Sequence, residues 1–225
     1  MDSKFGELNT VSADRQLPEN QYSQVYAHNG GTKILFIGNS ITKHGTAPQI
    51  GWHGNWGMAA SEESKDYVHL VVEEMNKTGC VDYSIAQCSR WERNYNEGEK
   101  VLNEYFQSAR DFEADVIVVR IGENMQIDGD EVNCKLNFEK MISFFNKTQK
   151  AKVIITNLFW NQTNLNRIIK EIATENNYIF CDISDLERDE KTMALGEYEH
   201  EGVSVHPGDY GMKCIAERIL YCILQ

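Results

Sequence analysis

The sequence predicts a three-layer α/β/α sandwich around a five-stranded parallel sheet, and three observations support this fold class. Short apolar runs alternate with longer stretches whose apolar residues recur every three to four positions, as in amphipathic helices. Several of the runs lack polar alternation, which is typical of strands buried on both faces. The alternation extends along the chain without an internal repeat or a linker, which favours parallel strands connected by crossover helices.

The predicted strands are rich in Val, Ile, Phe and Tyr, and they cover Lys33–Gly38, Val81–Gln87, Asp115–Ile121, Lys152–Asn157 and Tyr178–Ile183. The predicted helices each have one apolar face, and they cover Glu62–Lys77, Glu97–Arg110, Asn133–Thr148, Asn164–Asn176 and Asp209–Leu224. One Gly-rich segment, residues 44–61, interrupts the alternation directly after the first strand. A long loop at that place is usually functional.

The length of 225 residues suits one large domain, which we expect over residues 31–225, preceded by a polar tail or extension over residues 1–30. The formal net charge of −12 argues against a nucleic-acid partner, because phosphate binding needs clustered Lys and Arg. No apolar stretch approaches the roughly 20 residues that span a bilayer, so we expect no membrane partner. The sequence leaves the oligomeric state open.

Cysteine usage and the first thirty residues together predict a cytoplasmic protein. The six cysteines form no C-x-x-C pair, which favours free thiols in a reducing compartment. The N-terminal residues contain no apolar segment of the kind found in signal peptides. The alternative is a secreted or periplasmic origin with the leader removed.

The first strand ends in a tight turn that presents Ser40. Ligands bind at the carboxyl ends of the strands in a parallel sheet, so this serine lies where a nucleophile is expected. A serine hydroxyl also needs a base and a group that stabilises the oxyanion. His206, just before the last helix, and Asn124, just after the third strand, follow segments that end at the same edge of the sheet.

Three motifs in this order resemble those of the SGNH (GDSL-type) hydrolase superfamily, over about residues 33–224. Gly38-Asn39-Ser40-Ile41 is similar to the first block of that family, with Asn in place of the usual Asp. Gly122-Glu123-Asn124 resembles the third block, Gly-x-Asn, and residues 203–206 occupy the place of the fifth. The resemblance implies a flavodoxin-like sandwich and ester hydrolysis.

By the same resemblance, Ser40 is the nucleophile, His206 the general base, and the Asn124 side chain and the Ser40 backbone N–H are oxyanion donors. Serine would attack an ester carbonyl, the alcohol would leave with a proton from the histidine, and water would hydrolyse the acyl-enzyme. This chemistry needs no metal and no organic cofactor.

The sequence departs from the family pattern where the acid of a triad is expected. The family usually has Asp three residues before its histidine, and this chain has Val203 there. Two explanations stay open. Either Glu201 or Asp209 supplies a relocated carboxylate, or the backbone carbonyl of Val203 or Ser204 orients the imidazole.

A second departure concerns the glycine whose N–H usually completes the oxyanion hole. After the second strand the chain has no glycine at this place, so the backbone N–H of Cys88, Ser89 or Arg90 is the candidate donor. This assignment is expected to involve main-chain atoms only.

The long loop carries Trp52 and Trp56, and we expect them either to line a substrate pocket or to pack under the loop. The histidines at positions 44, 53 and 200 lack the spacing of metal ligands and are interpreted as loop residues.

These inferences predict an esterase that removes a small acyl group, most simply acetyl, from a carbohydrate or another small-molecule ester. A lipid or thioester hydrolase of the same family is one alternative. A non-catalytic glycan-binding module with a degenerate triad is another, suggested by the missing acid.

Overall fold

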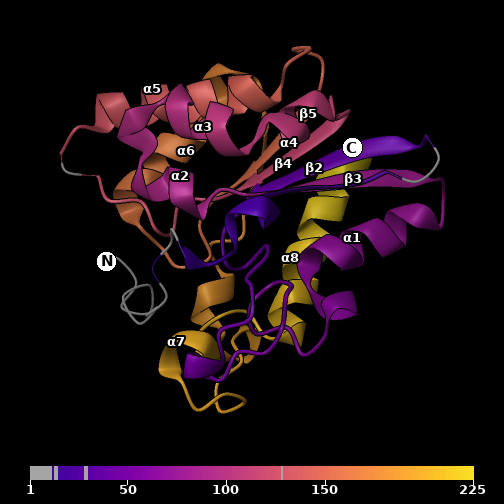
Figure 1. Ribbon diagram of the computed structural model, residues 1–225, viewed down its shortest axis with the longest axis vertical. Helices are drawn as coiled ribbons and strands as arrows, with labels where there is room; N and C mark the ends of the chain where they lie inside the picture. Colours follow the sequence, from indigo (N-terminus) through magenta and orange to yellow (C-terminus); the bar gives the residue numbers. More distant parts are fainter. Residues whose placement is uncertain (1–11, 13–14, 28–29, 128) are drawn as a thin grey trace.

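The computed structural model describes residue 12 and residues 15–27, 30–127 and 129–225, and it confirms the α/β sandwich. One sheet of six strands in the order β1-β3-β2-β4-β5-β6 forms the middle layer, and helices cover both of its faces (Figure 1). The strands are β1 (Ser23–Tyr26), β2 (Thr32–Gly38), β3 (Val81–Gln87), β4 (Val116–Arg120), β5 (Lys152–Thr156) and β6 (Ile179–Cys181).

Strands β2 to β6 pair in parallel and correspond to the five predicted strands. The five-strand prediction is one strand short, because β1 adds to the edge of β3 in antiparallel orientation. This strand lies in the segment expected to be a polar tail. It has only four residues and no fully buried position, so its backbone pairing leaves no apolar signature in the sequence. Residues 1–11, 13–14 and 28–29 of that segment lie outside the described residues.

The helices are α1 (Tyr67–Asn76), α2 (Ser89–Arg93), α3 (Glu99–Tyr105), α4 (Gln107–Asp111), α5 (Glu131–Phe145), α6 (Thr163–Glu175), α7 (Glu201–Ser204) and α8 (Asp209–Leu224). Helix α8 has the predicted bounds. Helix α1 begins later than predicted because the Asp66 side chain accepts the His69 N–H and caps it there. The helix predicted over residues 97–110 is two helices that meet at Phe106.

The sheet separates two apolar layers (Figure 1). Helices α1 and α8 pack together on one face, where their buried side chains meet Ile34 and Phe36 of β2. Helices α3 to α6 cover the other face and bury Leu35 and Ile37. Strand β2 is therefore buried on both sides, as its continuous apolar run predicts. None of the helices in the described ranges has the length and apolar character needed to cross a membrane.

Three strand ends meet at one level of the sheet and position the site. Gly38 at the end of β2 pairs with Gln87 of β3 on one side and with Arg120 of β4 on the other. A Cβ at Gly38 would approach the Thr42 hydroxyl oxygen to 1.7 Å, so the tight turn after β2 requires glycine. The segments that follow these three strands carry most of the predicted site residues.

Candidate active site

The structure brings Ser40 and His206 together, although they are 166 residues apart in the chain. The Ser40 hydroxyl lies 3.0 Å from Nε2 of His206, within hydrogen-bond reach. The backbone of Ser40 is fixed by the long loop, since its carbonyl accepts the Met58 N–H at 2.9 Å. The Ser40 N–H has no recorded partner among the described residues, so it is available as a donor to an oxyanion.

A backbone carbonyl orients the imidazole. Nδ1 of His206 lies 2.6 Å from the carbonyl oxygen of Gly202, and this geometry places the proton on Nδ1 and a lone pair on Nε2. Gly202 belongs to the short helix α7, which ends at Ser204. Carbonyls in the last turn of a helix lack intrahelical partners. Here the Nδ1–H of His206, four residues later, donates to the Gly202 carbonyl.

The expected carboxylates therefore do not face His206. Asp209 accepts hydrogen bonds from the backbone and hydroxyl of Ser61 and pairs with Lys65. Glu201 is exposed at the start of α7. Within the described ranges, no carboxylate bonds to the His206 ring. The carbonyl alternative is the one observed, at Gly202 rather than at Val203 or Ser204.

Burial determines the electrostatics of His206. The ring is 0% exposed, and Trp160, which sequence reasoning did not identify, packs edge-on against it with ring centroids 4.7 Å apart. The Trp160 Nε1–H donates to the Val205 carbonyl, which fixes the indole. Burial lowers the pKa of His206 to about 3; the Gly202 carbonyl opposes this shift, and nearby His44 and Arg120 add to it. The imidazole is therefore neutral at ordinary pH.

Asn124 follows β4, as predicted, and its side-chain amide is held by a residue that the sequence analysis missed. Nδ2 of Asn124 donates to Oε2 of Glu92 at 2.6 Å, and Oε1 of Glu92 accepts the Gly122 N–H at 2.6 Å. An amide nitrogen carries two hydrogens, so one remains for a developing oxyanion. The only sequence signal for Glu92 was a charged residue close to the end of β3, in the short helix α2.

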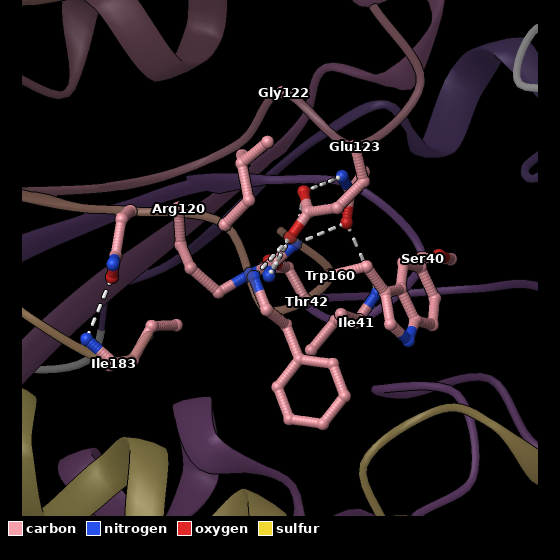
Figure 2. Close-up of polar contacts among 12 residues, drawn as sticks. Ser40, Ile41, Thr42, Arg120, Gly122, Glu123, Trp160 and Ile183 are labelled. Atoms are coloured by element: carbon pink, nitrogen blue, oxygen red, sulfur yellow. Dashed lines mark hydrogen bonds and ion pairs between the residues drawn. The ribbon is translucent and has the colours of Figure 1, made fainter. Parts of the chain in front are cut away.

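Glu92 is part of a buried polar network that includes Asn39, the residue before Ser40. Nδ2 of Asn39 donates to Glu92 at 2.9 Å and to Glu123 at 2.6 Å, while Oδ1 of Asn39 accepts from Arg120. The Arg120 guanidinium also donates to both carboxylate oxygens of Glu123 (Figure 2). Glu123 accepts the Phe159 N–H as well, which connects the network to the segment after β5. One arginine thus pairs directly with one of two buried glutamates.

Glu92, the second of the two buried glutamates, has a raised pKa. Burial and the neighbouring Glu123 charge raise the pKa of Glu92 to about 7, against the opposing effect of the bonds from Asn124, Asn39 and Gly122. Its four hydrogen-bond partners are all donors, which suits a carboxylate rather than a carboxylic acid. Glu92 therefore changes its charge near neutral pH.

The three candidates for a further backbone donor differ in their existing contacts. The Cys88 N–H donates to the Gly38 carbonyl at 2.6 Å, and the Ser89 N–H points to Oε1 of Gln87 at 3.3 Å. The Arg90 N–H has no recorded acceptor among the described residues. Arg90 is the remaining candidate, and its role stays a prediction.

The two loop tryptophans have different surroundings. Trp52 is 2% exposed and packs in a small apolar cluster that joins the loop to Ala194 and Val203, as expected if it packs under the loop. Its Nε1–H donates to the His44 carbonyl. Trp56 is half-buried and contacts Trp52 edge to face, which leaves it the better candidate for substrate contact.

The comparisons with known proteins bear on the fold. No protein-family model and no curated protein sequence matches the chain. Among solved structures, it is similar to a lipase/acylhydrolase from Enterococcus faecalis, with 18% identity and a TM-score of 0.56 over 85% of this chain and 95% of that one. The chain therefore has the fold of this hydrolase.

Two family two carbohydrate esterases also share the fold. The one from Cellvibrio japonicus is 13% identical with a TM-score of 0.57, over 85% of this chain and 60% of that one. The one from Clostridium thermocellum, solved with cellohexaose, is 14% identical with a TM-score of 0.55, over 85% and 63% respectively. This chain thus spans less than two thirds of the length of either esterase.

Proposed function

We propose that this chain, which has the fold of SGNH (GDSL-type) hydrolases, is a serine hydrolase that cleaves an ester through an acyl-enzyme. The contact that carries this proposal is the one between the Ser40 hydroxyl and Nε2 of His206, 3.0 Å apart. With Nδ1 donating to the Gly202 carbonyl, Nε2 has a free lone pair directed at the serine. This is the arrangement that general-base activation of a hydroxyl requires.

In the first half-reaction, the Ser40 oxygen attacks the ester carbonyl while its proton moves to Nε2 of His206. The negative charge on the former carbonyl oxygen is stabilised by the Ser40 N–H and by the second N–H of the Asn124 amide. The intermediate collapses, and the alcohol leaves with the proton from His206. Water then attacks the acyl-serine with His206 as base, which releases the acid and restores the serine.

The imidazolium formed in both steps has no carboxylate partner among the residues that the structure describes. The Gly202 carbonyl fixes the tautomer and accepts the Nδ1–H, but it contributes only a dipole. Burial makes the protonated ring costly, as its lowered pKa indicates. The enzyme we propose therefore relies more on the oxyanion side of the site than a complete Ser-His-Asp triad does.

We further propose a small acyl group, such as acetyl, on a carbohydrate or similar polyol. Ser40 is 1% exposed and is enclosed by packed residues, which favours a short acyl chain over a long one. The carbohydrate esterases of the same fold support the choice of alcohol, although lipases share this fold too. A lipid or thioester hydrolase is the alternative.

A fluorophosphonate probe and a panel of p-nitrophenyl esters test the proposal. We expect the probe to label the wild-type chain and not Ser40→Ala, and Ser40→Ala and His206→Ala each to lose on the order of 10⁴-fold or more in kcat for p-nitrophenyl acetate. Circular dichroism of both variants controls for folding. Absence of labelling in the folded wild type would support a non-catalytic module instead. Faster turnover of octanoate than acetate would favour the lipid alternative.

A further inference from the structure

The His44 imidazole has a buried nitrogen to which none of the described residues bonds. The residue lies four positions after Ser40 and is 1% exposed. Its Nδ1 is 2.6 Å from the Gly45 carbonyl oxygen, so Nδ1 carries the proton and Nε2 is an acceptor. Among the described residues, nothing donates to this Nε2. Nearly all buried polar atoms in native proteins have a partner, and a water molecule or a ligand can supply the one that Nε2 of His44 lacks.

His44 lies in the loop that also holds the backbone of Ser40. Its N–H donates to the Trp56 carbonyl, and two residues further on Met58 donates to the Ser40 carbonyl, so the two sides of the loop meet beside the nucleophile. Both imidazoles are buried, and His44 also contributes to lowering the pKa of His206. Burial lowers the pKa of His44 itself to about 4, so its Nε2 keeps the lone pair.

We propose that Nε2 of His44 accepts a hydrogen bond from a free hydroxyl on the alcohol part of the substrate, close to the ester oxygen. This inference rests on the proposed ester hydrolysis and narrows the substrate class to esters of diols, polyols and sugars. A neutral imidazole nitrogen suits a hydroxyl donor. An alkyl chain in the same place would leave the nitrogen buried and unpaired, and sites built for a hydroxyl reject analogues that lack it.

A second unpartnered atom at the same edge of the sheet agrees with a polyol. Gln16 is 1% exposed, and its Nε2 also has no partner among the described residues. Its Oε1 accepts from Gln87 at the end of β3, and its backbone carbonyl accepts the N–H of Gly45, the residue after His44. Gln16 therefore offers a donor where His44 offers an acceptor, and hydroxyl groups satisfy both.

Two esters of the same shape test this inference on the wild-type protein. 2-Hydroxyethyl acetate and propyl acetate differ only by a hydroxyl in place of a methyl group. We expect kcat/KM to be higher for the hydroxylated ester by about tenfold or more, the effect of one well-made hydrogen bond. Equal values for the two esters would overturn the inference without any variant.

Two substitutions of His44 then locate the hydroxyl contact. Asn places its amide near the position of Nδ1 and has nothing near Nε2, whereas Gln extends an amide oxygen toward the position of Nε2. We expect His44→Asn to abolish the preference for 2-hydroxyethyl acetate and His44→Gln to retain part of it. A preference that survives in folded His44→Asn would overturn the assignment to this nitrogen.

The proposed function is tested separately in the same experiments. Fluorophosphonate labelling of Ser40 and turnover of p-nitrophenyl acetate, which has no hydroxyl, report on ester hydrolysis alone. If both are present and the two acetate esters react equally, only the hydroxyl site fails. If both are absent in the folded wild type, the proposed function fails and the hydroxyl site fails with it.

Discussion

The two sides of Ser40 are built in different ways. On the base side, His206 is held by one backbone carbonyl and by the edge of Trp160. On the oxyanion side, Asn124 is attached to a buried network of four side chains that includes three ionisable groups (Asn39, Glu92, Arg120 and Glu123). The buried charge of the site is thus concentrated on the side that would bind the oxyanion, whereas the described residues that bond to the imidazole are uncharged.

This difference accounts for the asparagine in the first motif. The Asn39 amide donates to Glu92 and Glu123 together, while its oxygen accepts from Arg120. The Asp that resembling proteins usually have there would instead place a third carboxylate within about 3 Å of two others, and like charges at that distance cannot all ionise. The neutral amide of Asn39 therefore suits the buried carboxylate of Glu92, and we call this the charge match of the two residues.

The largest effect is expected when this match is broken with Asn39→Asp. Burial and two neighbouring carboxylates would raise the native pKa of the new aspartate against the opposing charge of Arg120, and we expect a loss of about 3–4 kcal/mol in unfolding free energy at pH 8. Because the native pKa is raised, the loss should shrink as the pH falls toward 4. Urea unfolding at pH 8 and pH 5 measures both values.

Two further variants test whether the loss of stability comes from the added charge beside Glu92. Asn103→Asp makes the same change at an exposed helical position and should alter stability by no more than about 0.5 kcal/mol. Adding Glu92→Gln to Asn39→Asp removes one of the carboxylates and should recover part of the loss. Simple additivity of the two substitutions would contradict the pairing of Asn39 with Glu92.

The next effect concerns catalysis on the oxyanion side. Asn124→Ala removes a donor to the developing charge and should lower kcat for p-nitrophenyl acetate by about 10²–10³-fold. Glu92→Gln keeps the Asn124 donor but weakens the hydrogen bonds that hold it, since an amide cannot accept from every donor that surrounds Glu92. We expect kcat to fall about tenfold. Equal losses for the two variants would mean that Glu92 does more than position Asn124.

Sequence patterns were sufficient where long apolar stretches determine the structure. Helix α8 and strand β3 have the predicted bounds, because each shows a clear periodicity or a buried run. Strand β1 could not be predicted, since it is held by backbone pairing to β3 and has no buried side chain of its own. The break at Phe106 was also invisible, because the apolar face continues through it.

The site residues also divide into those with a sequence signal and those without one. Ser40, Asn124 and His206 could be named as candidates because their motifs resemble those of a known family and lie close to strands or helices with a strong signal. The Gly202 carbonyl could not, since every residue has such a group and only the end of helix α7 leaves this one available. Glu92 could not either, because a charged residue in a helical segment is usually exposed, and its burial depends on partners that follow other strands.

The smallest predicted effect is in the pH profile, and it distinguishes the two sides of Ser40. His206, with a pKa lowered to about 3, stays neutral down to pH 5, so it gives no acidic limb between pH 8 and pH 5. Glu92, with a pKa raised to about 7, becomes protonated over this range and loses acceptor capacity for Asn124. We therefore expect kcat/KM for p-nitrophenyl acetate to fall only about threefold from pH 8 to pH 5.5, with an apparent pKa close to 7. The profile of Glu92→Gln should be flat over the same range. A limb near pH 6.5 that persists in Glu92→Gln would belong to His206 and would mean that the imidazole titrates as it does in water.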